Sequence, residues 1–236
     1  MKARFHNRTD AGRQLAQKLL SYAKRPDVIV LALPRGGVPV AYEVATVLQV
    51  PLDLCLVRKL GVPNHAELAM GAIARPDIRV LNSDIIASLN VSPQAIAQVT
   101  QQEEQELQRR DRCYRGQRPS PCLRDRTVIL IDDGIATGST LSAAIAALKQ
   151  QAPARIVVAV PVAPASTAAL IEQVVDQLVC LQLPENLYSI SLWYEDFSQT
   201  SDDEVKQLLA KASSSLLALS AATSFNGVDP QGTSRW

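Results

Sequence analysis

The sequence predicts an α/β fold, a doubly wound and mainly parallel sheet with helices on both faces. Short runs of branched apolar residues, such as Val28 to Leu33 and Val128 to Ile131, are typical of strands covered on both sides. Segments with a helical pattern separate most of these runs, which indicates βαβ units. Polar or glycine-containing loops follow Leu33, Val57 and Ile131, and ligands of such sheets bind at the carboxyl ends of strands.

The individual elements follow from apolar periodicity and from the residues that begin and end it. Thr9 and Asp10 precede an amphipathic stretch and predict a capped first helix. The strands are expected over residues 28–33, 52–57, 70–74, 79–81, 128–131, 155–160 and 178–181, with a hairpin between 70–74 and 79–81. The helices are expected over residues 11–22, 38–48, 92–114, 141–148, 165–176 and 202–219.

The helix over residues 92–114 is long and polar. Ser92 and Pro93 form a start signal, because Pro is favoured at the first helical position after a Ser cap. Acidic residues precede basic ones along this helix, an order that suits the helix dipole and i,i+4 pairing. Two interpretations stay open: a solvated helix, or a contact between subunits.

Length and composition exclude several classes of protein. The chain has 236 residues, enough for a well-buried core, and a formal net charge of +1. This charge balance gives no reason to expect a nucleic-acid surface. The apolar runs are too short to cross a bilayer, and the N-terminus lacks the apolar core of a signal peptide. The four cysteines lack the spacing of metal ligands, so we expect a protein of the reducing cytoplasm.

The segment from Val128 to Thr140 carries the strongest chemical signal. A buried strand ends in two adjacent carboxylates, Asp132 and Asp133, and a loop of small residues then leads into a helix. Backbone N–H groups and hydroxyls at a helix N-terminus can bind a phosphate dianion. Carboxylates can accept hydrogen bonds from a diol or approach a divalent cation. The segment therefore predicts a ribose 5-phosphate site, and the alternative is an ordinary strand–loop–helix junction.

A Walker phosphate loop is excluded, because no Lys follows Gly138 and the glycine spacing differs. Instead, the segment resembles the signature of the type I phosphoribosyltransferases. The resemblance implies that Asp132 and Asp133 hold the ribose hydroxyls of phosphoribosyl pyrophosphate and approach Mg²⁺, directly or through water. It also implies that the 5-phosphate is bound by the loop of Ala136, Thr137, Gly138, Ser139 and Thr140.

The segment from Leu33 to Gly37 resembles the pyrophosphate loop of the same family. Glycines let backbone amides turn inward, and Arg35 offers a planar cationic fork. The resemblance implies that Arg35, Gly36 and Gly37 bind pyrophosphate and that the peptide bond between Pro34 and Arg35 is cis. Without the acidic segment, an ordinary turn would explain these residues equally well.

Arg58 and Lys59 resemble the Arg-Lys pair that often precedes a mobile flap in the family. The flap would span residues 60–67, whose Gly, Pro and Asn residues are expected to prevent helix or strand formation. The resemblance implies that Arg58 and Lys59 are catalytic and that Lys59 steadies the leaving group. His65 and Glu67 are acid–base candidates in the flap, or alternatively exposed loop residues.

Two features bear on the acceptor. The 6-oxopurine enzymes of the family carry an Asp immediately before the Thr-Gly, where this chain has Ala136. Hypoxanthine and guanine are therefore not the expected acceptors. Trp193 and Tyr194 lie in an aromatic segment that could stack on a flat ring or anchor the C-terminal helix to the core.

The resemblance covers most of residues 5–210 and is strongest with a bacterial branch described as predicted phosphoribosyltransferases. We expect one domain over residues 1–220 and a flexible C-terminal tail over residues 221–236. Hood elements are expected from about residues 1–10, 60–80 and 184–200, and a helical insertion over residues 83–116.

The resemblance implies a Mg²⁺-dependent enzyme of nucleoside metabolism that moves ribose 5-phosphate from phosphoribosyl pyrophosphate to a small nitrogenous acceptor. A homodimer is also implied, with neither nucleic acid nor membrane as a partner. Two alternatives stay open: a non-catalytic regulator that binds phosphoribosyl pyrophosphate or a nucleotide, and a hydrolase of a phosphorylated sugar or nucleotide.

Overall fold

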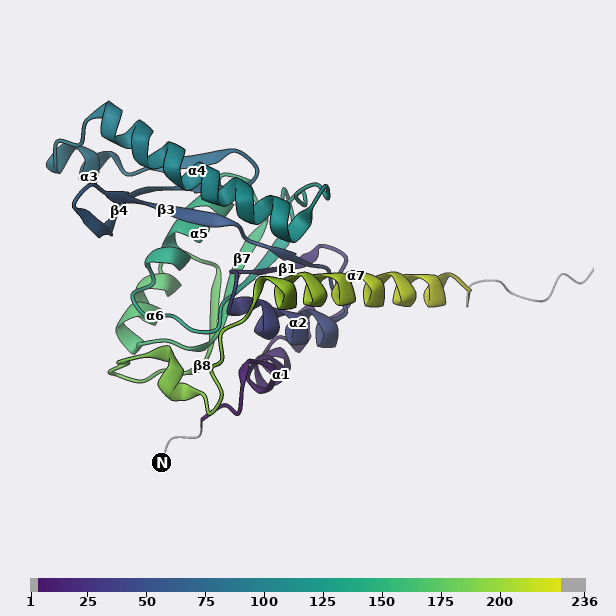
Figure 1. Cartoon of the computed structure of the whole chain (residues 1–236). Coiled ribbons are helices and arrows are strands. Elements are labelled where there is room, and N and C mark those ends of the chain that lie inside the picture. The colour runs from purple at the N-terminus through teal and green to yellow at the C-terminus, as the bar shows by residue number, and fades with distance from the viewer. Residues whose placement is uncertain (1–3, 226–236) are drawn as a thin grey trace, which may run out of the picture.

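A five-stranded parallel sheet in the order β2-β1-β6-β7-β8 forms the centre of the protein (Figure 1). The computed structural model describes residues 4–225, apart from the side chains of residues 66, 67 and 219–225. The strands of this sheet are β1 (Val28–Ala32), β2 (Leu52–Leu54), β6 (Thr127–Ile131), β7 (Arg155–Val162) and β8 (Gln177–Gln182). Every neighbouring pair is parallel, which confirms the predicted α/β fold.

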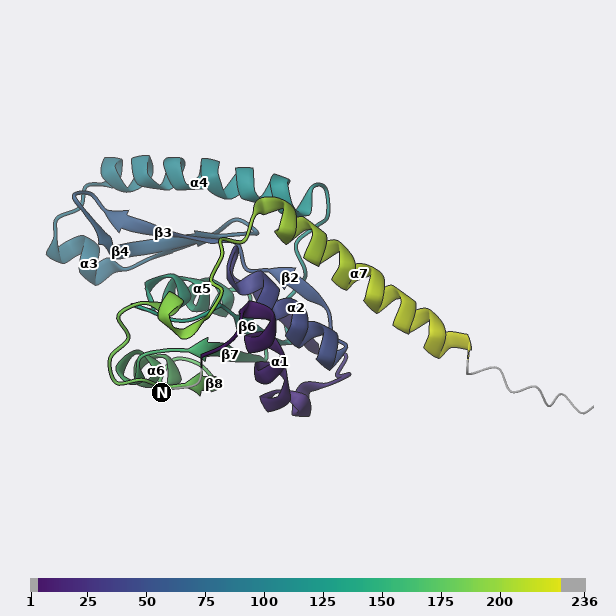
Figure 2. The ribbon, with the colours of Figure 1, turned by 60° about the horizontal axis from the view of Figure 1, so that its bottom comes forward.

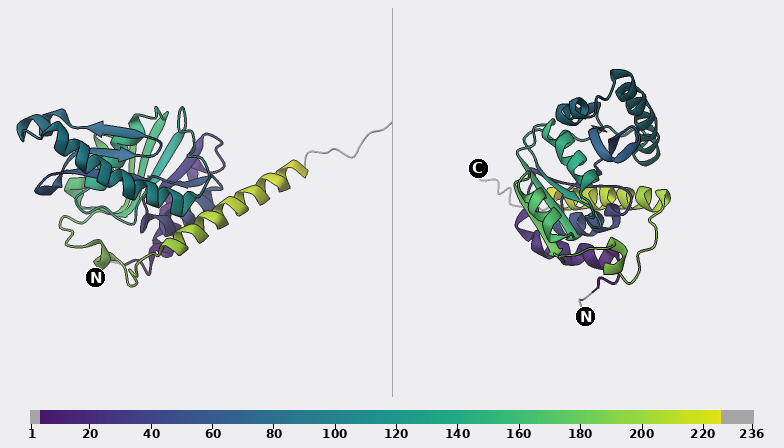
Figure 3. Two further views of the ribbon diagram at one scale, coloured as in Figure 1. Left: turned by 45° about the horizontal axis from the view of Figure 1, so that its top comes forward. Right: turned by 90° about the vertical axis from the view of Figure 1, so that its left-hand side faces the viewer.

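Helices cover both faces of the sheet (Figure 3). Those on one face are α1 (Arg8–Lys18) and α2 (Gly37–Leu48), and those on the other are α5 (Ser139–Lys149) and α6 (Ala165–Glu172). Side chains alternate along each strand, so Val28 and Val30 of β1 pack toward α1 and α2 while Ile29 and Leu31 pack toward α5. The uniformly apolar run of β1 is explained by this burial on both sides.

A second, antiparallel sheet forms the hood beside the main sheet (Figure 2). Its strands are β3 (Val57–Val62), β4 (His65–Ala74) and β5 (Ile78–Leu81), and the predicted hairpin of 70–74 with 79–81 is confirmed. The chain then forms α3 (Ser83–Ser88) and α4 (Pro93–Arg115), with Ser92 as the predicted cap of α4. Helix α4 packs against β3 and β4 on one side of the hood, and α5 contacts the hood from the other side.

The hairpin of β3 and β4 corrects two expectations. These are the strand over residues 52–57 and the irregular flap over residues 60–67. Strand β2 ends at Leu54, and the antiparallel strand β3 begins at Val57. Gly61 does not end β3, because the strand pairing shifts register there and continues. Asn64 has a φ of 65° in the tight turn between β3 and β4. Lys59 therefore lies within an antiparallel hood strand, not after a strand of the main sheet.

The two ends of the described chain also differ from expectation. Helix α1 is capped by Asn7 instead of Thr9 and Asp10, and a separate 3-10 turn, η1 (Leu20–Tyr22), follows it. Helix α7 (Asp202–Phe225) is longer than predicted and includes the start of the segment expected to be a flexible tail. It contacts α2 and α4, and its end extends away from the rest of the chain (Figure 1). The rest of that tail, residues 226–236, lies outside the described residues.

Among the helices that the structure describes, none is both long enough and apolar enough to cross a bilayer.

Candidate active site

The loop after β6 forms a cradle for an anion at the start of α5. Gly138 precedes α5 with a φ of 76° and has no side chain to cap the helix, while the N–H of Ser139 lies 3.5 Å from Oγ1 of Thr137. A Cβ atom at Gly138 would lie 2.9 Å from Cγ2 of Thr167, so both the backbone conformation and the space favour glycine. The side chains of Thr137 and Thr140 are exposed beside it. Backbone N–H groups and hydroxyls thus meet at a positive helix end, the arrangement that binds phosphate.

The two predicted carboxylates lie between this cradle and β6. The backbone N–H of Asp133 donates a 2.9 Å hydrogen bond to Oδ1 of Asp132. Burial raises the pKa of Asp132 well above its ordinary value, and the neighbouring charge of Asp133 raises it further. Burial also raises the pKa of Asp133, although Arg8 opposes that effect.

Arg8 is a residue of this site that the sequence interpretation missed. Its Nε and Nη2 atoms both lie 2.8 Å from Oδ2 of Asp133, and its side chain is only 11% exposed. The guanidinium also stacks 3.9 Å from the ring centroid of Phe197 and donates to the carbonyl of Ser198 at 2.6 Å. One signal could have pointed to it: Arg8 is the first residue of a helix, where a cation opposes the helix dipole and needs an anionic partner.

The predicted pyrophosphate loop packs directly against the carboxylates. A Cβ atom at Gly36 would lie 2.0 Å from Oδ2 of Asp133, and one at Gly37 would lie 2.8 Å from the carbonyl oxygen of Ile131. Both positions therefore need glycine. The peptide bond between Pro34 and Arg35 is cis, as the resemblance implied. Arg35 extends from the loop so that its Nη1 atom lies 3.5 Å from Oδ1 of Asp202, the first residue of α7.

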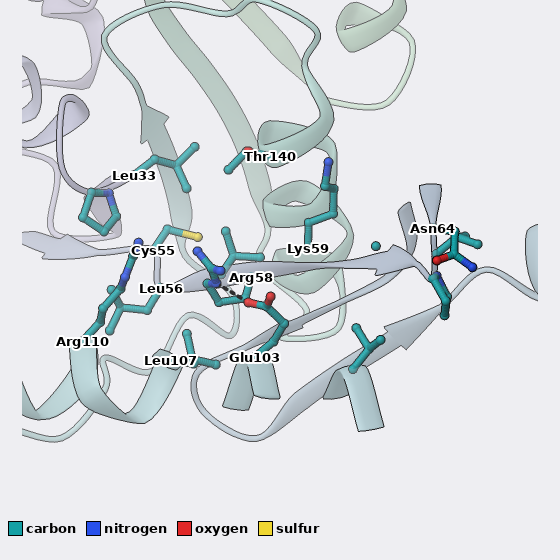
Figure 4. Close-up of a pocket in the computed structure, with 16 residues that line it drawn as sticks. Leu33, Cys55, Leu56, Arg58, Lys59, Asn64, Glu103, Leu107, Arg110 and Thr140 are labelled. Atoms are coloured by element: carbon teal, nitrogen blue, oxygen red, sulfur yellow. Dashed lines mark hydrogen bonds and ion pairs between the residues drawn. The ribbon is translucent and has the colours of Figure 1, made fainter. Parts of the chain in front are cut away.

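A cavity of about 620 Å³ lies between the loop after β1, strand β3 and helix α4 (Figure 4). Thr140 of the phosphate cradle lines it from one side and Pro34 of the pyrophosphate loop from another. Its apolar lining includes Leu56, Leu107 and the buried Cys55, whose pKa burial raises to about 12. Its charged lining consists of Arg58, Lys59, Glu103 and Arg110.

Arg58 and Lys59 occupy this cavity differently. Consecutive residues of a strand point to opposite faces, and Figure 4 shows the two side chains leaving β3 in different directions. The Nε atom of Arg58 donates to Oε2 of Glu103 on α4, so the insertion helix holds this guanidinium. The catalytic roles expected of Arg58 and Lys59 stay predictions. Glu103 was not predicted as a partner.

One acid–base candidate lies away from the cavity lining. His65 is the exposed first residue of β4, next to the hairpin turn, and is not among the residues that line the cavity. The side chain of Glu67 lies outside the described part of the chain. An acid–base role for either residue stays a prediction.

The aromatic segment holds the N-terminal residues against the acidic pair. The ring of Tyr194 is buried, with ring centroids 5.4 Å from Phe5 and 5.0 Å from Phe197. Its hydroxyl donates a 2.6 Å hydrogen bond to the carbonyl oxygen of Asp133. These contacts join the N-terminal segment to the acidic pair, and the two roles expected of Tyr194, stacking on an acceptor or anchoring the C-terminal helix, stay predictions. Trp193 is half-buried in η2 (Ile190–Trp193), and its contact with an acceptor stays a prediction.

The carboxylates of the site suit a metal ion that binds together with a phosphorylated substrate. No group of three or more acidic, His or Cys side chains that could hold a metal occurs in the described part of the chain. Asp132 is half-buried and Asp133 is buried beside the anion cradle, and Arg8 binds Oδ2 of Asp133. Mg²⁺ commonly takes one or two protein carboxylates and completes its shell with water and substrate phosphates. The residues present therefore fit Mg²⁺ that is shared with a phosphorylated substrate.

Comparisons with known proteins agree with this geometry. The model of the phosphoribosyl transferase domain matches residues 3–195. Two curated Mycobacterium tuberculosis proteins, from strains CDC 1551 and H37Rv, are each named "Putative phosphoribosyl transferase" and are 44% identical to this chain over 208 residues. The match covers 88% of this chain and 47% of each relative, so the chain spans about half their length. The crystal structure of TT1426 from Thermus thermophilus is similar, with a TM-score of 0.79 and 36% identity over 88% of this chain and 98% of that one.

Proposed function

The chain belongs to the phosphoribosyl transferase family, and on this premise we propose that it transfers ribose 5-phosphate from phosphoribosyl pyrophosphate to a nitrogenous acceptor. Pyrophosphate is the second product. One observation carries the proposal: the loop after β1 packs against the carboxylate of Asp133, beside the phosphate cradle at the start of α5. The residues proposed to bind a diol, a monophosphate and a pyrophosphate thus follow the carboxyl ends of two neighbouring strands, which supports the proposal.

Each part of the donor has a partner in this proposal. The 5-phosphate binds the backbone and hydroxyls of residues 137–140, and the ribose hydroxyls bind Asp132 and Asp133. The loop of Arg35, Gly36 and Gly37, together with Lys59, binds the pyrophosphate. These groups are fixed by the fold, so most of the rate enhancement comes from positioning and charge stabilisation.

The reaction breaks the bond between C1 of the ribose and the pyrophosphate oxygen, and an acceptor nitrogen forms the new bond to C1. Negative charge accumulates on the leaving group, where Arg35 of the loop after β1 supplies a guanidinium. Mg²⁺ held by Asp132 and Asp133, directly or through water, would neutralise part of the pyrophosphate charge. Ala136 offers no side-chain hydrogen bond to a ring, which argues against a 6-oxopurine acceptor.

A double variant, Asp132→Asn with Asp133→Asn, tests the proposal. We expect loss of nucleotide formation with little change in shape, because Asn keeps the volume and removes the charge. The matched control is Asp125→Asn, which removes an exposed carboxylate before β6, at the opposite end of that strand from Asp132. Turnover in the double variant at the rate of the control would overturn the assignment.

The reaction type is tested by pyrophosphate release from phosphoribosyl pyrophosphate with and without a panel of bases and amines. Release that depends on an acceptor supports the transferase. Release without an acceptor would show a hydrolase instead, and binding without release would show a regulator.

A further inference from the structure

The insertion helix α4 forms one wall of the cavity beside the pyrophosphate loop. Val99, Glu103, Leu107 and Arg110 all line this cavity. Their spacing of three and four residues places them on one face of the helix. In Figure 4, Arg110 points from α4 toward the cavity, which Cys55 and Pro34 also line. A cation from the insertion thus faces the loop that is proposed to bind pyrophosphate.

The charges of this wall favour an anion. Three cations and one carboxylate are among the residues that line the cavity, and the carboxylate, Glu103, is bonded to Arg58. Arg110 donates from Nε to Oε1 of Glu106 at 2.7 Å. Glu106 is shared, because Arg109 also binds it at 2.7 and 3.0 Å. One carboxylate therefore serves two guanidiniums, and Arg109 has a second partner in Asp202, whose Oδ2 atom lies 3.8 Å from its Nη1 atom.

We propose that Arg110 binds the pyrophosphate group of the donor from the side opposite the loop after β1, so that α4 completes the leaving-group pocket. This inference rests on the proposed function. A guanidinium held at Nε by Glu106 can present its Nη edge to a second anion, and phosphate oxygens match that planar fork. The cavity touches Pro34 and Thr140, so it adjoins both the pyrophosphate loop and the 5-phosphate cradle.

The test measures two ligands by titration calorimetry on the full chain in the presence of Mg²⁺. Inorganic pyrophosphate probes the leaving-group pocket, and ribose 5-phosphate probes the cradle. For Arg110→Gln we expect the Kd of pyrophosphate to rise by about tenfold or more, as for loss of a charge-assisted contact. The Kd of ribose 5-phosphate should stay within about twofold, since Arg110 lies outside the cradle, and Arg110→Lys should recover part of the pyrophosphate affinity.

The matched control is Arg112→Gln, which removes the same charge from an exposed position of the same helix. We expect about the wild-type affinity for both ligands, because an exposed and distant charge is screened. Unchanged pyrophosphate affinity in Arg110→Gln, or an equal loss in Arg112→Gln, would overturn the inference. So would a parallel loss of ribose 5-phosphate binding, since that indicates a general disturbance. If the wild-type chain binds neither ligand, the proposed function fails as well; if it binds both without dependence on Arg110, only this inference fails.

Discussion

The Nε atom of Arg8 donates a 2.8 Å hydrogen bond to Oδ2 of Asp133, which joins residues 125 positions apart in the chain. The same carboxylate oxygen is the atom that a Cβ at Gly36 would meet. Asp133 is therefore the point where the first helix, the acidic pair and the pyrophosphate loop converge. Changes on any of these three segments are expected to affect the other two.

Replacing Arg8 by Ala should destabilise the protein strongly. Asp133 is only 9% exposed, and without Arg8 its carboxylate would be buried without a cation. Loss of one partner of such a pair costs about 3 kcal/mol in the free energy of unfolding. Urea unfolding followed by tryptophan fluorescence measures this cost. The control is Arg13→Ala, since Arg13 is 67% exposed in its pair with Glu43 and should contribute less than about 1 kcal/mol. Equal unfolding midpoints for the two variants would contradict the prediction.

Replacing Gly36 by Ala should abolish donor binding. The added Cβ would lie 2.0 Å from Oδ2 of Asp133, so the loop after β1 or the carboxylate must move. We expect the affinity for phosphoribosyl pyrophosphate to fall by about a hundredfold or more, equivalent to loss of one or two charge-assisted hydrogen bonds. Calorimetry with the Mg²⁺ complex of the donor measures the loss.

Gly116→Ala is the control for that experiment. Its Cβ would meet nothing within 4 Å, although the φ of 62° makes the backbone strained for Ala. This control should lose about 1–3 kcal/mol of stability and keep its donor affinity. A Gly36→Ala protein that binds the donor as tightly as Gly116→Ala would show that the loop tolerates a side chain.

Cys55 should resist alkylation in the folded protein. Burial raises its pKa to about 12, so at pH 8 roughly one molecule in ten thousand carries the reactive thiolate. Cys122 is exposed and should react first with iodoacetamide. Mass spectrometry of peptides after timed labelling separates the two sites. Labelling of Cys55 at the rate of Cys122 in the absence of denaturant would contradict the burial seen here.

The ion pairs of Glu106 should make the free energy of unfolding depend on pH in the acid range. Hydrogen bonds from Arg109 and Arg110 lower its pKa from 4.5 to about 2. A lowered folded-state pKa means that the ionised form stabilises the folded state. This contribution is complete above the unfolded value of 4.5 and is lost as the pH falls toward 2.

Thermal melting at a series of pH values tests this contribution. Between pH 4.5 and 2, the melting temperature of the wild type should fall more steeply than that of Glu106→Gln. Glu104→Gln, which removes an exposed carboxylate two residues away, should follow the wild-type profile. Parallel curves for the wild type and Glu106→Gln would show that the pair with Arg109 and Arg110 contributes nothing.

The core of the site was predictable because its parts are contiguous in the chain. The apolar run of β6, the carboxylates Asp132 and Asp133, and the small residues before α5 all fall within residues 127–140. Strand propensity and helix-start preferences act over such short distances. The glycines of the loop after β1 were predictable for the same reason. The packing of Gly36 against the carboxylate of Asp133 was not predictable, because the two residues are far apart in the chain.

The hood hairpin shows where local signals fail. Gly61, Pro63 and Asn64 suggested an irregular flap, but the same residue types also form bulges and tight turns. Which outcome occurs depends on whether a partner strand and a covering helix are available. Here β4 pairs with β3, and α4 packs on the hairpin, so the segment is ordered as strands.

The sequence by itself determined the parallel sheet, the acidic pair at the end of β6 and the glycine-containing start of α5, since each depends on periodicity or on neighbouring residues. Only the tertiary structure decided that Arg8 binds Asp133, that Glu103 holds Arg58 and that Arg110 lines the same cavity as Pro34. These contacts join side chains from different elements, and the burial and charge that make them favourable exist only after the elements have packed.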